Sequence, residues 1–190
     1  LGVIRGHIAA DQLDVALEAA DRLSKSRKDV LTAHYLKGFV LFRMQDWVEA
    51  ERALFKVEDV TREHPPTMHL MAAVKYQLGK NSEAQTRLEQ YLNIDGSNVS
   101  ARKLLATIAN ERQDYARVVE LLEPISLQQS DPQVWAMLGA ALLRVDQHAS
   151  ATAALEKAVG LAPDMASFRN ELALSMITSG DMDGAVDQLS

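Results

Sequence analysis

The amino-acid sequence predicts an all-α solenoid built from antiparallel helix hairpins. The first observation is a series of small residues that recurs at intervals of 34, 34, 33 and 34 residues: Gly38, Ala72, Ala106, Gly139 and Ala173. The second is a companion series twelve residues further on, in which only one member is larger than alanine: Ala50, Ala84, Val118, Ala151 and Ala185. The third is a composition rich in good helix formers, with almost no alternation of the strand type. A period of this length is typical of stacked helical hairpins rather than of a single globular core.

Each hairpin in such a stack buries its apolar face only against its neighbours. The spacing divides the chain into four full units and two incomplete ones at the ends: 1–30 (incomplete), 31–64, 65–98, 99–131, 132–165 and 166–190 (incomplete). We therefore expect 1–190 to form one solenoid domain. Leu1 already lies within an apolar pattern, so we also expect this domain to be a fragment of a longer protein.

The first, incomplete unit runs through Val3, Ile4, Ala16 and Leu23. The pattern is clearest in the unit 132–165. There Leu138 and Leu142 lie one helical turn apart, and small residues at 139 and 151 allow two helices to approach closely. Asp146 and Gln147 are expected in the turn between the helices, and Pro163 is expected to end the second one. In the unit 99–131, Pro124 falls inside the second helix, where we expect it to kink or end that helix.

These recurring residues resemble the tetratricopeptide repeat, whose pattern is an aromatic, Leu-Gly, a larger residue, Ala, an aromatic or Leu, Ala and Pro. The best copy carries every element of it: Trp135, Leu138, Gly139, Leu142, Ala151, Leu155, Ala158 and Pro163. The resemblance covers essentially the whole chain. It implies a right-handed superhelix whose leading helices line a concave, protein-binding groove.

Four short stretches are similar to one branch of that superfamily, the repeat lipoproteins that accompany bacterial exosortase (PEP-CTERM) sorting systems: residues 100–106, 120–124, 138–144 and 171–175. This resemblance implies a lipid-anchored protein on the periplasmic side of the cell envelope, linked to surface-protein sorting and exopolysaccharide production. Without it, the cytoplasm is the expected location, since no signal is visible in 1–190.

Composition narrows the function classes. The formal net charge of −6 argues against a nucleic-acid partner. The absence of cysteine excludes disulfides, thiolate metal sites and thiol nucleophiles. No apolar run reaches the roughly 18 residues of a membrane-spanning helix. The sequence also lacks the short motifs of serine hydrolases, nucleotide-binding loops and zinc proteases. We expect no catalysis, no cofactor and no metal.

The repeat register places one stripe of side chains from each leading helix in the groove. The expected partner-contacting residues are Tyr35, Phe39, Phe42, Arg43, His69, Tyr76, Lys103 and Thr107. Aromatic side chains that lead into polar ones suit a peptide with apolar anchors and a polar tail. The alternative is that these aromatic residues pack between hairpins.

The sequence therefore predicts a non-catalytic scaffold that binds protein or peptide segments. Two alternatives remain open, namely a module that regulates or targets an enzyme domain outside 1–190, and a solenoid that self-associates end to end. Solenoids need polar capping units at their ends, and the ends of 1–190 show none.

We therefore expect four apolar side chains to be exposed at the two ends: Val3, Ile4, Val186 and Leu189.

Overall fold

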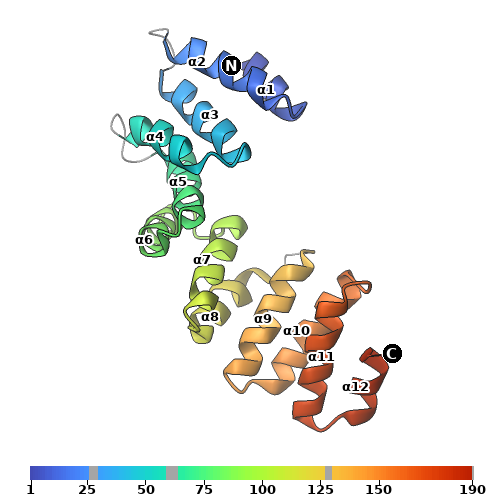
Figure 1. The fold of residues 1–190 in the computed structure, drawn as a ribbon. Coiled ribbons are helices and arrows are strands. Elements are labelled where there is room, and N and C mark those ends of the chain that lie inside the picture. Colours follow the sequence, from blue (N-terminus) through green and yellow to red (C-terminus); the bar gives the residue numbers. More distant parts are fainter. Residues whose placement is uncertain (26–29, 59–63, 127–129, 190) are drawn as a thin grey trace. The chain divides into compact units, whose positions relative to one another are not determined.

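The computed structural model describes residues 1–25, 30–58, 64–126 and 130–189, and within these ranges it contains helices and turns but no strand. The helices in this part of the chain are α1 (Gly2–Ala9), α2 (Leu13–Ser24), α3 (Val30–Arg43), α4 (Trp47–Glu58), α5 (Pro65–Gln77), α6 (Asn81–Leu92), α7 (Val99–Glu111), α8 (Tyr115–Ser126), α9 (Pro132–Arg144), α10 (His148–Leu161), α11 (Ala166–Ser179) and α12 (Met182–Leu189) (Figure 1). The predicted all-α fold class is confirmed.

Consecutive helices pair as antiparallel hairpins, and each pair falls within one predicted repeat to within one residue. The chain divides into two compact units, residues 1–96 with α1–α6 and residues 97–190 with α7–α12. The division lies in the connection between the third and fourth hairpins. Continuity of the stack through this connection stays a prediction.

Every hairpin turn in the described chain contains one residue in the left-handed backbone region. These residues are Asp11, Gln45, Gly79, Gln113, Asp146 and Gly180. They follow the same period as the small residues of the helices, with the single shorter interval between 113 and 146. Only two of them are glycine, although a left-handed conformation disfavours side chains that carry a Cβ. The hairpin geometry therefore imposes this conformation on the four Asp and Gln residues.

The close approach expected within the hairpins is confirmed at the two glycines of the small-residue series. A Cβ atom at Gly38 would lie 2.6 Å from Leu54 Cγ, and one at Gly139 would lie 2.6 Å from Leu155 Cγ. The alanines of the companion series are fully or almost fully buried. Both units thus use the same packing rule, in which a leucine of the second helix fills the space above a glycine of the first.

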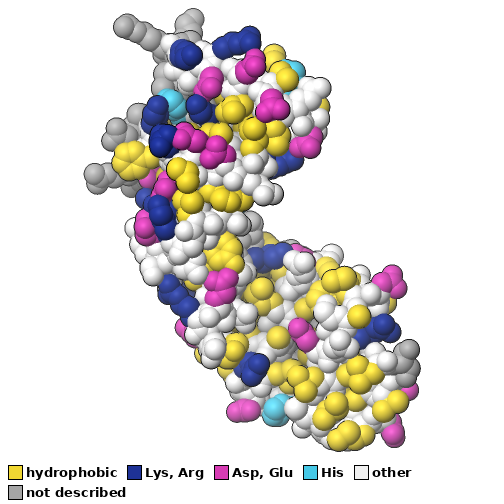
Figure 2. Space-filling model, viewed as in Figure 1, with side chains coloured by type: hydrophobic (Ala, Val, Ile, Leu, Met, Phe, Trp, Pro, Cys, Tyr) yellow, Lys and Arg dark blue, Asp and Glu magenta, His cyan; other side chains and the backbone are white. Residues whose placement is uncertain are grey.

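Three of the four apolar side chains that we expect to be exposed at the ends of the chain are exposed. Val3, Val186 and Leu189 are exposed, and Figure 2 shows hydrophobic side chains gathered on the surface of the last helices. The expectation for Ile4 is wrong, because its side chain is only 3% exposed. It is enclosed by neighbours from its own and the next hairpin: Ala16, Ala20, Leu36 and Val40.

Candidate partner-binding surface

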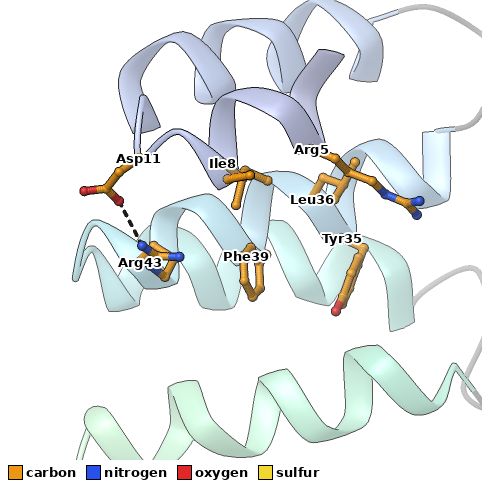
Figure 3. A pocket seen from close by; sticks show the side chains of 8 residues that line it. Arg5, Ile8, Asp11, Tyr35, Leu36, Phe39 and Arg43 are labelled. Carbon is orange, nitrogen blue, oxygen red and sulfur yellow. Dashed lines mark hydrogen bonds and ion pairs between the residues drawn. The ribbon is translucent and has the colours of Figure 1, made fainter. Parts of the chain in front are cut away.

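A solvent-open hollow of about 390 Å³ lies between the leading helices α1 and α3 of the first unit. Its lining comes from α1, the turn after α1, and α3: Arg5, Ile8, Ala9, Asp11, Tyr35, Leu36, Phe39 and Arg43 (Figure 3). Three of these, Tyr35, Phe39 and Arg43, are expected groove residues. They follow one another at intervals of four residues and therefore form one stripe along α3.

The hollow is apolar at its centre and charged at its ends. Ile8 and Phe39 lie in the middle, Leu36 lies beside Arg5, and Ile8 and Leu36 belong to the hydrophobic core of the first hairpins. At one end Arg43 Nη2 lies 2.8 Å from Asp11 Oδ1. At the other end is Arg5, for which the described part of the chain provides no ion-pair partner. An apolar side chain of a partner can therefore pack against the centre of the hollow, and a carboxylate of the partner can pair with Arg5.

Aromatic rings extend this surface toward α5. The ring of Tyr35 stands edge-on to His64, with 5.6 Å between the ring centroids. On α5 the ring of His69 is tilted against that of Tyr91, with centroids 5.3 Å apart. Burial raises the pKa of Tyr35, which the nearby positive charge of Arg5 opposes, and burial lowers the pKa of His69. We therefore expect His69 to be a neutral, partly enclosed ring at pH 7.

Three expected groove residues of the first unit do not line the hollow: His69, Phe42 and Tyr76. The ring of Phe42 packs edge-on against Trp47 at the start of α4, with centroids 5.1 Å apart. It also contacts the buried cluster of the second and third hairpins. Tyr76 is half-buried on α5. The contacts of Phe42 agree with the alternative in which some of these rings pack between helices.

The last two expected residues, Lys103 and Thr107, belong to the second unit. Lys103 forms an ion pair with Asp131, whose other carboxylate oxygen accepts the Gln133 N–H at the start of α9. Burial alone would raise the pKa of Asp131, but these interactions outweigh it and hold the pKa below its usual value. Thr107 Oγ1 donates to the Lys103 carbonyl oxygen at 3.0 Å. Both side chains thus already have intramolecular partners.

Sequence reasoning missed the contribution of α1 to the hollow. Subtracting the repeat period of 34 from Phe39, Phe42 and Arg43 gives Arg5, Ile8 and Ala9, all of which line it. The register therefore contains the signal, although the first repeat is an incomplete copy of the pattern. Asp11 lies in the left-handed turn, and the groove pattern does not extend to turn residues.

Among the residues that the structure describes, no cluster of three or more His, Asp or Glu side chains is arranged to hold a metal ion. The same residues include no helix with the length and apolarity needed to cross a membrane.

Two family models, both described as tetratricopeptide repeat, match the sequence. One matches residues 4–65 and 136–190, and the other matches residues 75–141. A search of curated proteins finds no match.

Several solved structures share the fold. MamA 41-end from Desulfovibrio magneticus RS-1 is 19% identical, with a TM-score of 0.77 over 86% of this chain and 93% of that one. A double mutant designated MamA RS-1 has a TM-score of 0.78 at 19% identity, over the same shares of the two chains. A structure designated MamA AMB-1 has a TM-score of 0.77 at 20% identity, over 84% of this chain and 87% of that one. At these identities the likeness establishes the fold alone.

Proposed function

This chain belongs to the tetratricopeptide repeat family, and from that premise we propose that it is a non-catalytic interaction module that holds an extended protein segment in the hollow between α1 and α3. Repeats of this family serve as scaffolds for protein–protein interaction. The observation that carries the proposal is the hollow itself, which is open to solvent and has a half-buried apolar centre between two charged ends.

The chemistry of the hollow favours a particular kind of segment. A medium-sized apolar side chain would pack against Ile8 and Phe39, where desolvation of apolar surface supplies the binding energy. An acidic side chain or a terminal carboxylate would pair with Arg5, which has no competing anion in the described chain. Arg43 is less available because Asp11 already neutralises it.

The wider groove would extend this binding surface. His69 and Tyr76 would contact the continuation of the segment over α5, whereas Phe42 would stay packed against Trp47. In the second unit, Lys103 and Thr107 would contact a partner only if the ion pair between Lys103 and Asp131 opened. The binding energy is therefore expected to come mainly from the first unit.

Replacing both Tyr35 and Phe39 by alanine should abolish high-affinity binding. Truncating a central aromatic anchor often costs about 2 kcal/mol or more, equivalent to roughly thirtyfold in affinity. Ligands would be identified by pull-down from envelope extract with the wild-type chain, and their dissociation constants then measured with each variant. Circular dichroism would check that the variant remains folded.

The matched control is Phe55→Ala. Phe55 is an aromatic residue of the same unit that is 61% exposed on α4 and lies outside the hollow. The Phe55→Ala variant should bind the ligand with the same affinity as the wild type. Equal affinities for wild type and the Tyr35→Ala/Phe39→Ala variant would place the binding site elsewhere.

We further propose that the parent protein is an exosortase-linked envelope lipoprotein. The support is the similarity of four short stretches to the sequences of those lipoproteins, at residues 100–106, 120–124, 138–144 and 171–175. Fractionation of cells that express the parent protein tests the proposal. The protein should sediment with membranes and carry a lipid-modified cysteine upstream of Leu1, and an unmodified protein in the soluble cytosolic fraction would contradict it.

A further inference from the structure

A second hollow in the first unit, of about 430 Å³, lies among α2, α3 and α4. Almost all of its lining is polar or charged: Asp21, Ser24, Lys25, His34, Lys37, Glu49, Arg52, Ala53 and Lys56. Its α3 residues, His34 and Lys37, lie on the face of α3 opposite to Tyr35 and Phe39, given the rotation of about 100° per residue. The two hollows are thus separate surfaces. We call this one the basic hollow.

Positive charge exceeds negative charge in the basic hollow. Both of its carboxylates are already engaged, since Lys37 Nζ lies 2.6 Å from Asp21 Oδ1 and Arg52 forms an ion pair with Glu49. Lys25 and Lys56 have no ion-pair partner within the described ranges of the chain. The chain as a whole carries a formal net charge of −6, so this excess is a local property.

The imidazole of His34 on α3 also lines the basic hollow. Its Nδ1 atom is buried and has no hydrogen-bond partner among the described residues. Burial lowers the pKa of His34, and the positive charges of Lys56 and Lys37 lower it further. A buried polar atom without a partner and adjacent like charges both cost free energy. An anion in the basic hollow would offset the adjacent positive charges of Lys56 and Lys37.

We propose that the basic hollow binds a phosphate-type oxyanion, held by Lys25 and Lys56, with the His34 ring lining the same hollow. An oxyanion of this class accepts several hydrogen bonds at once, and ammonium groups bind it as point charges. Asp21 and Glu49 do not repel it strongly, because Lys37 and Arg52 neutralise them. The phosphoryl group could be free in solution or part of a lipid headgroup, and the experiment separates these two sources.

The first arm follows the imidazole resonances of His34 by NMR while inorganic phosphate is added to the full chain. The chemical shifts of these resonances should change as phosphate is added and reach a plateau at saturation. Chloride at equal ionic strength should produce no such change. In Lys56→Gln the apparent affinity for phosphate should fall by about tenfold, because a hydrogen bond to a charged group is lost. Lys157→Gln on α10, an exposed lysine of the second unit, is the matched control and should behave as wild type.

The second arm measures co-sedimentation with vesicles of phosphatidylcholine, with and without phosphatidylglycerol. Binding to phosphatidylglycerol vesicles that is lost in Lys56→Gln would identify a lipid headgroup as the source. Saturation by inorganic phosphate without vesicle binding would identify a soluble anion. Equal responses to phosphate and chloride, or a Lys56→Gln variant with unchanged phosphate affinity, would overturn the proposal. Lys56 is exposed on α4, so this variant is expected to fold.

Discussion

Gly139→Leu should lower the free energy of unfolding by about 1–3 kcal/mol, the range expected when a tightly packed core is overfilled. Even the first added carbon would lie 2.6 Å from Leu155 Cγ and 3.2 Å from the Ala151 carbonyl oxygen. The leucine belongs to the fully buried core of its hairpin and the oxygen belongs to the backbone of α10, so neither can move without separating the two helices. Urea denaturation followed by circular dichroism would measure the change.

A comparison of two glycine-to-alanine variants tests whether the close contact with Leu155 causes this loss of stability. Gly160 lies in α10 of the same hairpin, and a Cβ there would meet nothing within 4 Å. Gly160→Ala should therefore stabilise the chain by about 0.5–1 kcal/mol through helix propensity. Gly139→Ala gains the same propensity but should be net destabilising because of the contact with Leu155. If both variants shifted the midpoint in the same direction, the assignment of Gly139 to a close contact would be wrong.

The helix pairs could be predicted because the sequence repeats its packing constraints. A small residue is required wherever two helices approach closely, and that requirement recurs once in every hairpin. The left-handed turn residues recur with the same period, yet they are hard to recognise because Asp, Gln and Gly share this position. Only Gly79 and Gly180 carry the usual signal for a positive φ angle.

Side-chain partners were harder to predict than helix positions. The repeat register correctly grouped Tyr35, Phe39 and Arg43, since residues four apart share a helix face. It could not show that Lys103 pairs with Asp131, because that pairing joins residues 28 positions apart through side-chain conformations. The repeat pattern places Ile4 at an open end of the stack, whereas contacts from α2 and α3 bury it.

The repeat pattern also does not predict the partly buried network of charged side chains around Lys75. The equivalent positions in three other repeats are Leu41, Ala109 and Leu142, all buried. The Lys75 side chain is 12% exposed, and its Nζ lies 2.5 Å from Glu51 Oε1 and 2.6 Å from Glu83 Oε2. The ammonium group thus links α4, α5 and α6, and Lys80 adds a second cation to Glu51 at 2.8 Å.

Glu51→Ala should therefore destabilise the chain by about 2 kcal/mol, because it leaves a buried ammonium with only Glu83 as a partner. Replacing Lys75 by leucine in the same chain should restore most of the loss, since leucine suits this position in other repeats. The single and double variants together form a cycle that separates the cost of an unpaired charge from the cost of lost packing. A double variant no more stable than Glu51→Ala would show that packing dominates.

The pH dependence gives a second test of the same network. Burial alone would raise the pKa of Glu51, but hydrogen bonds from Lys75 and Lys80 outweigh it and hold the pKa below its usual value. A carboxyl group whose pKa is lowered in the folded state contributes stability above its unfolded pKa of about 4.3. That contribution is lost as the pH falls through the folded value. The stability difference between wild type and Glu51→Ala should thus be constant near pH 7 and shrink in acid. A difference that persisted unchanged to pH values well below the folded pKa would show that the carboxylate charge is not what stabilises Lys75.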